Sequence, residues 1–127
     1  MSGPLMILVA GPYRSGTNGD PGLIQANVEA MTRVALDLYR RGHLPVLGEW
    51  FALPLIEEAK RRDPGADADA DAEIFHPVAE LLLAHCDACL RIGGPSEGAD
   101  RMVVTAERLG KAVYRDIGAI PLTEPVP

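Results

Sequence analysis

The sequence contains a glycine-rich loop whose side chains are suited to holding a small polar ligand. Glycines let backbone N–H groups approach a ligand, an arginine can bind a phosphate or carboxylate through two hydrogen bonds, and a tyrosine can stack on a planar base. The loop has neither the Gly-Lys-Ser/Thr of a P-loop nor the G-x-G-x-x-G of dinucleotide-binding proteins. A plain connection with a solvated arginine is the alternative interpretation, although the segment exceeds the usual length of about 2–6 residues. The candidate ligand-binding residues here are Gly11, Pro12, Tyr13 and Arg14.

A second loop, residues 93–98, combines a turn with the start of a helix. The free N–H groups of a helix N-terminus, together with the Ser96 hydroxyl, can hold an anion against the helix dipole. Alternatively, Ser96 only caps the helix and Glu97 only complements its dipole. Both interpretations require the same geometry, so the sequence does not choose between them. The candidate ligand-binding residues of this loop are Gly94, Ser96 and Gly98.

Three carboxylates near the predicted strand ends are candidates for acid–base or nucleophilic chemistry: Glu49, Glu97 and Asp100. Beside Glu49, Trp50 can wall a pocket for an aromatic base or simply pack onto the following helix. Asn27 falls within the apolar stripe of its predicted helix, where a buried amide needs hydrogen-bond partners. It can hold a ligand or fix the backbone of the first loop, and we favour the second role.

The sequence predicts no metal site and no cofactor. Cys86 and Cys89 lie where a helix leads into a strand, whereas redox cysteine pairs usually precede a helix, so two core cysteines are expected. The acidic stretch of residues 63–73 begins like a calcium loop, but Ala72 and Val78 occupy the positions of the required glycine and glutamate. We expect a solvated loop there. His76 and His85 have no ligand spacing and are expected to be ordinary helix residues.

The hydrophobic pattern predicts four strands alternating with helices, at residues 5–10, 43–48, 89–92 and 111–114. Asp20 and Pro21 are typical of a helix start, and Pro45 favours an edge position for the second strand. A second helix is expected from Pro54 to about Arg62, and a third ends near Cys86 with its start or a kink at Pro77. The last helix follows Ser96. Leucines predicted on the inner helix faces include Leu23, Leu38 and Leu109.

This alternation predicts an α/β fold: a single Rossmann-like domain with a four- to five-stranded, mainly parallel sheet and helices on both faces. We expect the strand order 2-1-3-4, which places the topological switch between the first and third strands. Ligands bind such sheets beyond the carboxyl ends of the strands at that switch. Both candidate loops leave those strand ends, and we therefore expect Arg14 and Ser96 to face one ligand position. We expect the domain to span residues 1–117, followed by a loosely held, Pro-rich tail at 118–127.

The composition restricts the partners. The chain has 127 residues, a net charge of −6, 13 glycines and 11 prolines. Its length fits one domain. Its negative charge disfavours non-specific binding to nucleic acid polymers or anionic membranes. No apolar run approaches the ~18 residues needed to span a bilayer, and we expect a cytoplasmic protein.

The order of several short motifs resembles the nucleoside 2-deoxyribosyltransferase-like superfamily. The resemblance extends from about Leu5 to Tyr114. It implies a Rossmann-like sheet, cleavage or exchange of the N-glycosidic bond of nucleosides or nucleotides, and homodimers or higher homo-oligomers. The motifs are Ile7–Tyr13, a helix with Asn27, Arg41–Val46, Cys86-Asp87-Ala88, Ser96-x-Gly98-Ala99 and Gly110–Val113.

The family's catalytic residues are not all present. In the family, a nucleophilic glutamate lies six residues after the serine, and this position holds Met102 here. A thioether cannot supply that charge. A further family aspartate falls near Ala79, with Glu80 beside it. Two hypotheses remain: a nucleoside or nucleotide N-glycosidic enzyme (a transferase or a hydrolase) that uses another carboxylate, and a nucleotide-binding module that lacks the chemistry.

Overall fold

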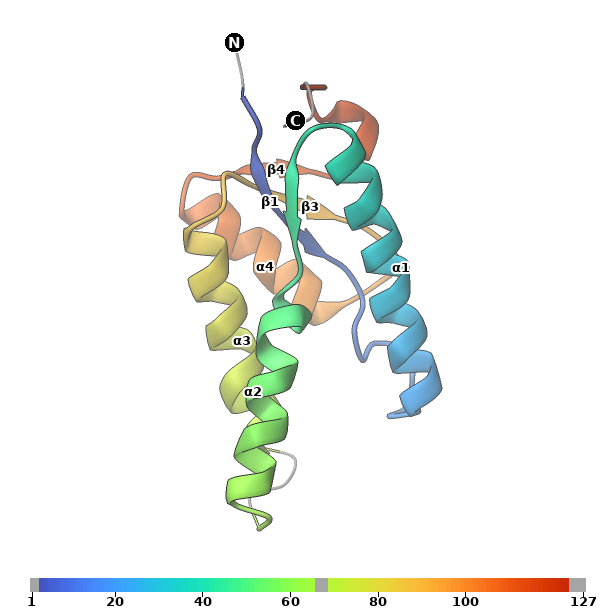
Figure 1. Ribbon diagram of the computed structural model, residues 1–127, viewed down its shortest axis with the longest axis vertical. Helices are drawn as coiled ribbons and strands as arrows, with labels where there is room; N and C mark the ends of the chain where they lie inside the picture. Colours follow the sequence, from blue (N-terminus) through green and yellow to red (C-terminus); the bar gives the residue numbers. More distant parts are fainter. Residues whose placement is uncertain (1–2, 66–68, 124–127) are drawn as a thin grey trace.

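A computed structural model describes residues 3–65 and 69–123. Within them, a four-stranded sheet carries helices on both faces, with strand order β2-β1-β3-β4 (Figure 1). All three strand pairs are parallel. The strands are β1 (Met6–Ala10), β2 (Leu44–Val46), β3 (Ala88–Arg91) and β4 (Ala112–Tyr114). The predicted fold class and strand order are therefore confirmed.

Four α-helices and one short 3₁₀ helix connect or follow the strands in this part of the chain. The helices are α1 (Pro21–Arg40), α2 (Gly48–Arg62), α3 (Asp69–Ala84), α4 (Glu97–Arg108) and the 3₁₀ helix η1 (Ile117–Ala119). Asp20 caps α1 through hydrogen bonds from the backbone N–H groups of Gly22 and Leu23, as its position before Pro21 predicts. No helix among the described residues is long and apolar enough to cross a bilayer.

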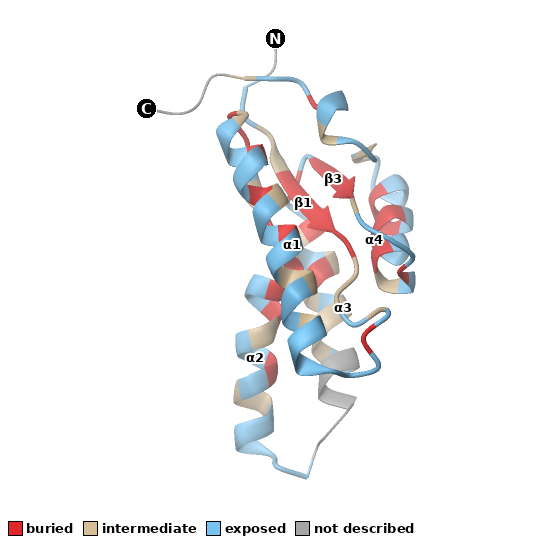
Figure 2. Ribbon diagram, turned by 90° about the vertical axis from the view of Figure 1, so that its right-hand side faces the viewer, coloured by how far each residue is buried: buried red, intermediate tan, exposed pale blue. Residues whose placement is uncertain are grey.

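Two hydrophobic clusters form the core, one on each face of the sheet. Ile7 and Val9 of β1 pack with α1, whereas Leu8 and Ala10 pack with α3 and α4. This alternation follows from the two-residue period of a strand. Both central strands are almost wholly buried, as Figure 2 shows. A continuous apolar run is thus the pattern expected for a strand covered on both faces.

Three predictions about helices are wrong. Helix α2 begins at Gly48, and Pro54 lies inside it. Helix α2 packs against α3 and the sheet. This tertiary packing outweighs the cost of the backbone N–H that each proline, Pro54 in α2 and Pro77 in α3, lacks. Similarly, α3 begins before Pro77, at Asp69, so part of the predicted acidic loop is helical; its Asp67 lies outside the described residues. Leu23, in the first turn of α1, and Leu109, the C-cap of α4, are exposed rather than on inner helix faces.

The start of the expected loose tail is instead packed against the domain. Ile120 is buried, the Arg41 guanidinium donates to its carbonyl oxygen at 2.9 Å, and Thr123 N–H donates to the Arg41 carbonyl. Gly42 has φ +95°, and a Cβ there would lie 2.2 Å from the Thr123 carbonyl oxygen. Glycine is therefore required at position 42, where the backbone has a positive φ and lies directly against Thr123. The prediction is wrong for residues 118–123, because the residues that hold them are distant in sequence; residues 124–127 lie outside the described part of the chain.

Candidate functional site

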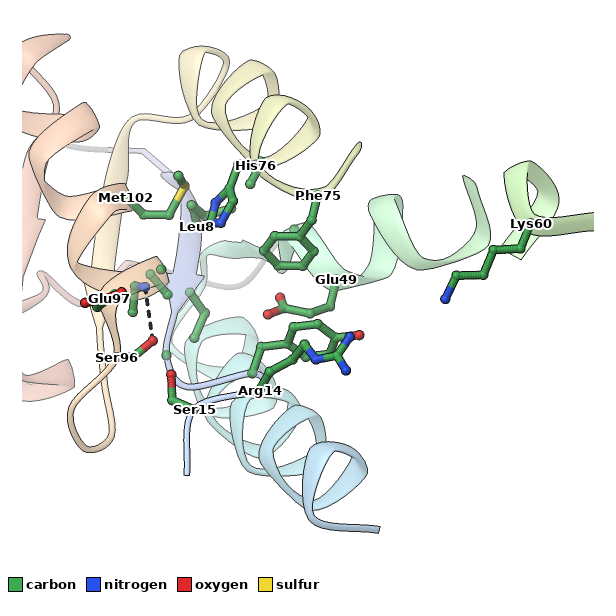
Figure 3. Close-up of a pocket in the computed structure, with 18 residues that line it drawn as sticks. Leu8, Arg14, Ser15, Glu49, Lys60, Phe75, His76, Ser96, Glu97 and Met102 are labelled. Carbon is green, nitrogen blue, oxygen red and sulfur yellow. Dashed lines mark hydrogen bonds between the residues drawn. The ribbon is translucent and has the colours of Figure 1, made fainter. Parts of the chain in front are cut away.

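A cavity of about 620 Å³ opens at the carboxyl end of β1, where the topological switch was expected (Figure 3). Its lining comes from the loop after β1 and from the segments where α2, α3 and α4 approach the sheet. The volume falls within the range of small-molecule sites, about 300–1,000 Å³. The two predicted loops do border one cavity, through Tyr13, Arg14, Ser15, Ser96, Glu97 and Gly98.

The loop after β1 is held in place by its own hydrogen bonds and by α1. Asn27 Nδ2 donates to the Tyr13 carbonyl at 2.9 Å and to the Ser15 carbonyl at 3.5 Å. Thr17 Oγ1 donates to the Arg14 carbonyl at 2.6 Å. Asn27 does not line the cavity, so the structure places it as the support of this loop rather than as a ligand contact.

The Tyr13 ring forms part of the cavity wall. It stacks on Phe75 of α3, with 5.2 Å between ring centroids and an interplanar angle of 2°. One face of the ring that was expected to receive a base is thus covered by Phe75. The pair joins the β1 loop to α3 and gives the cavity an aromatic boundary.

The two loops pack directly against each other at Gly93 and Pro12. Gly93 has φ +80°, and a Cβ there would lie 2.6 Å from Pro12 Cδ. Any side chain at this position would collide with the proline ring. Neither Pro12 nor Gly94 lines the cavity. Of the residues predicted to contact ligand, Pro12 instead packs against Gly93, and the Gly94 carbonyl accepts a hydrogen bond from Arg91.

Ser96 caps α4 and also lines the cavity. Its hydroxyl accepts a hydrogen bond from the Ala99 N–H at 3.2 Å, and the residue is buried. The sequence left open whether Ser96 caps a helix or faces a ligand; its position is compatible with both. Figure 3 shows the Arg14 guanidinium directed toward the α2 side of the cavity, whereas Ser96 lies on the opposite side. The two residues therefore reach different parts of one cavity.

Buried Arg91 fixes the second loop from behind. Its guanidinium donates to the carbonyl oxygens of Ile92 and Gly94, the latter at 2.8 Å, and forms a 3.0 Å ion pair with Asp100. Asp100 does not line the cavity. This candidate carboxylate is thus the partner of Arg91 and has no direct access to a ligand there.

Glu49 is the candidate carboxylate that the structure directs into the cavity (Figure 3). It lies in the first turn of α2 and is only 4% exposed. Burial raises the pKa of its carboxyl group to about 7, and a hydrogen bond from its own backbone lowers it to a smaller extent. Within the described residues it forms no salt bridge. Glu49 can therefore be either protonated or ionised near neutral pH.

The neighbouring residues of α2 face elsewhere. Trp50 and Phe51 are exposed and do not line the cavity, contrary to the expectation for Trp50. Since α2 starts at Gly48, successive side chains are about 100° apart around the helix. A helix at this point can turn only one of the three adjacent side chains into the cavity, and it turns Glu49.

The α4 residues include Glu97 and Met102. Glu97 borders the cavity, but Figure 3 shows its carboxylate directed away from it. Met102 is buried and lines the cavity, as does Ala79. Glu80 instead accepts a hydrogen bond from Thr105 Oγ1 at 3.2 Å and lies 3.6 Å from Arg101. Met102 and Ala79 thus make this part of the cavity wall apolar.

The sequence interpretation missed several cavity residues: Ser15, Lys60, Phe75 and His76. The sequence predicts an ordinary helix residue at His76, but His76 lines the cavity. Its Nδ1 atom is buried without a hydrogen-bond partner among the described residues. Local spacing did not indicate this role, because the residues around His76 in the cavity, such as Leu8 and Met102, are distant in the sequence.

The cysteines contribute no chemistry to the site. Both are buried and free, as predicted. Burial raises the pKa of Cys86 to about 11 and that of Cys89 to about 12, so both remain thiols at neutral pH. The residues that the structure describes include no cluster of three or more His, Cys, Asp or Glu able to hold a metal ion.

Together, the cavity offers one buried carboxyl group of intermediate pKa, two cationic side chains at its border (Arg14 and Lys60), an aromatic wall and a helix N-terminus. This set can bind a small polar molecule with a planar part and can transfer a proton to or from it. No model of a known protein family matches the sequence, and no curated protein is significantly similar to it.

Proposed function

We propose that this protein hydrolyses the N-glycosidic bond of a nucleoside or nucleotide, with Glu49 as the general base. The observation that supports this best is a 4% exposed carboxyl group that lines a 620 Å³ cavity and has a pKa of about 7. A base with such a pKa is ionised to a useful extent at neutral pH and is still basic enough to accept a proton. The motif resemblance supplies the substrate class.

The reaction needs only one positioned base. The ionised Glu49 carboxylate accepts a proton from a water molecule while the water oxygen bonds to C1′ of the sugar. The bond from C1′ to the base nitrogen breaks, and its electron pair stays on the nitrogen. The released nucleobase then takes up the proton that Glu49 removed from water, directly or through solvent, which restores the Glu49 carboxylate. The products are the free nucleobase and the free sugar or sugar phosphate. The transition state resembles an oxocarbenium ion, which a nearby carboxylate also stabilises.

Hydrolysis is favoured over deoxyribosyl transfer because of Met102. Transfer through a covalent glycosyl–enzyme intermediate requires a nucleophile at the position that the resemblance assigns to this residue. Met102 is buried and has no charge to offer. Attack by water avoids this requirement, since Glu49 activates the nucleophile without becoming it.

Met102 also favours a second candidate function, a nucleotide-binding module without catalysis. In that case the cavity holds a nucleoside or nucleotide, and Glu49 accepts a hydrogen bond from it or donates one to it. The resemblance further implies a homodimer or higher homo-oligomer. Sedimentation of the purified chain tests this oligomeric state. We also propose a cytoplasmic location.

The deciding experiment incubates the protein with ribo- and 2′-deoxyribonucleosides and their 5′-monophosphates and detects released base by chromatography. We expect at least one substrate to be cleaved, and Glu49→Gln to reduce cleavage by about 10²–10⁴-fold. Glu97→Gln is the matched control, because its carboxylate is directed away from the cavity in Figure 3. Asp100→Asn is a second control and keeps an oxygen for Arg91.

Three outcomes would contradict the proposal. Saturable binding without base release by the wild-type protein would establish the binding module instead. Base release that Glu49→Gln leaves unchanged would show that another group is the base. Loss of release in Glu97→Gln with normal folding would move that role to Glu97.

A further inference from the structure

The ring of His76 is positioned to contact a ligand in the cavity. Helix α3 brings it to the cavity lining, where Figure 3 shows it and the Met102 side chain pointing toward one another. Phe75 lies edge-on to the ring at 5.5 Å between centroids. On the α4 side, Gly98 lies next to the imidazole, since a Cβ there would be at van der Waals distance, 3.4 Å, from His76 Cε1. The ring is thus confined from three directions.

The two ring nitrogens have different surroundings. Nδ1 is buried and has no hydrogen-bond partner within residues 3–65 and 69–123. Nε2 also forms no hydrogen bond with these residues, but it is not buried. Nε2 is therefore the polar atom of this side chain that a molecule in the cavity can reach.

The buried nitrogen determines which tautomer is favoured. A buried N–H without an acceptor is rarer in proteins than a buried acceptor without a donor. Placing the proton on Nε2 leaves Nδ1 as the bare acceptor and puts the N–H where a ligand or solvent can satisfy it. Doubly protonated His76 is disfavoured, because burial and the charge of Arg101 lower the pKa of the ring, while Glu80 raises it to a smaller extent.

We infer that His76 presents an Nε2–H donor to the cavity and binds a hydrogen-bond acceptor of the ligand, namely a ring nitrogen or carbonyl oxygen of a nucleobase. This inference rests on the proposed function for the class of ligand. The surroundings suit a planar heterocycle, since Leu8, Ala79 and Met102 supply apolar contacts in the same cavity. Glu49 then lies on the side of the sugar, and His76 orients the base without acting as the catalytic base.

The tautomer is measured in the free protein, so this part of the test needs no substrate. In ¹⁵N-histidine-labelled protein, two-bond ¹H–¹⁵N correlation spectra distinguish Nε2–H, Nδ1–H and imidazolium rings. His76→Gln identifies the His76 signals among those of the three histidines. We expect a neutral Nε2–H ring at pH 7. An Nδ1–H ring or an imidazolium at this pH would overturn the inference.

Ligand contact is tested by titrating adenosine, guanosine, cytidine and uridine, and their 2′-deoxy forms, into Glu49→Gln protein, which should bind without turnover. We expect at least one nucleoside to shift the His76 Nε2 resonance. In the same background, His76→Gln keeps an N–H near the Nε2 position, His76→Asn keeps one only near Nδ1, and His76→Phe keeps neither. Affinity should stay within about threefold for Gln and fall about tenfold for Asn and Phe, the usual effect of one lost hydrogen bond.

The inference and the proposed function fail in different ways. Base release by the wild-type protein with no shift at Nε2, or with equal affinities for the three His76 variants, overturns only the role of His76. A shift at Nε2 without any base release supports the role of His76 and overturns the enzyme. If no nucleoside shifts Nε2 at all, the inference is wrong whatever the tautomer.

Discussion

Asn27 of α1 donates a 2.9 Å hydrogen bond to the carbonyl oxygen of Tyr13 and thereby joins the first helix to the loop that borders the cavity. The same amide lies 3.5 Å from the Ser15 carbonyl. One polar side chain on a largely apolar helix face thus holds two carbonyl groups of a loop that has little regular structure. The position of the cavity wall depends on this contact.

Asn27→Asp should loosen that loop. The substitution keeps the shape of the side chain but replaces the donating amide with a carboxylate that faces two carbonyl oxygens. We expect a loss of about 1–2 kcal/mol in the free energy of unfolding and faster amide hydrogen exchange in residues 11–19. Gln25→Glu, the same chemical change on the exposed side of α1, is the control and should alter neither measurement. Equal effects of the two variants would mean that charge, not the lost hydrogen bonds, is responsible.

Glu49 should make the protein less stable as the pH rises. Its pKa increases from 4.5 to about 7 on folding, so the folded state binds the proton more tightly than the unfolded state. The stability that this provides is fully present below pH 4.5 and is lost as the pH rises through about 7. The change amounts to roughly 3 kcal/mol.

Glu49→Gln removes this dependence, because an amide does not titrate. The stability of the variant relative to the wild type should therefore increase by up to about 3 kcal/mol between pH 4 and pH 8, measured by urea unfolding at each pH. Taking the difference cancels the other titrating groups. A difference that stays constant across this range would show that Glu49 does not titrate abnormally.

Under the proposed hydrolytic mechanism, the same group should control the rate of base release. Because Glu49 must be ionised to accept a proton from water, kcat/KM should rise about tenfold per pH unit below pH 7 and level off above it. The residual activity of Glu49→Gln should lack this inflection. A rate that falls as the pH rises through 7 would indicate instead that the protonated acid is the active form.

Arg91→Met should disorganise the loop before α4. The methionine preserves much of the apolar stem but removes the hydrogen bonds to Ile92 and Gly94 and the ion pair with Asp100. We expect the free energy of unfolding to fall by about 2–4 kcal/mol. Arg108→Met, on the exposed part of α4, should change it by less than about 0.5 kcal/mol. Similar losses in both variants would remove the special role of Arg91.

His43 should anchor the segment around Pro121. Its Nε2 donates to the Pro121 carbonyl at 2.6 Å, since a carbonyl can only accept, and its Nδ1 accepts from the Leu5 N–H at 3.0 Å. His43→Phe loses both bonds, and we expect a destabilisation of about 1–3 kcal/mol and faster proteolysis beyond Tyr114. His85→Phe, at an exposed position, is the control. Unchanged proteolysis in His43→Phe would show that Ile120 and Arg41 suffice to hold the segment.

Local sequence patterns predicted the main strands, the starts of two helices and the sheet topology. The unbroken apolar run before Gly11 gave the central strand, and Asp20 and Ser96 gave the starts of α1 and α4, because these signals act through neighbouring residues. The alternation of strands and helices predicted a parallel sheet with right-handed crossovers, and the expected strand order 2-1-3-4 is confirmed. The strand order also predicted that both glycine-containing loops leave the sheet at the same end, beside one another. This placed the cavity at the carboxyl ends of β1 and β3.

The sequence could not assign roles to the polar residues around the cavity. The sequence offered Glu49, Glu97 and Asp100 as equal candidates. In the structure, Glu49 points into the cavity because α2 starts at Gly48, and Asp100 instead forms an ion pair with Arg91. His76 had no recognisable spacing, because its neighbours in the cavity come from β1 and α4. Similarly, nothing local showed that His43 and Arg41 hold the chain beyond Tyr114.

By itself, then, the sequence determined an α/β domain and predicted a cavity at the switch between β1 and β3, since hydrophobic periodicity, helix caps and strand–helix alternation are local or topological signals. The tertiary structure decided which carboxyl group is chemically unusual. Burial of Glu49 depends on α2, α3 and the sheet coming together, and desolvation by residues distant in the chain is what raises its pKa to about 7.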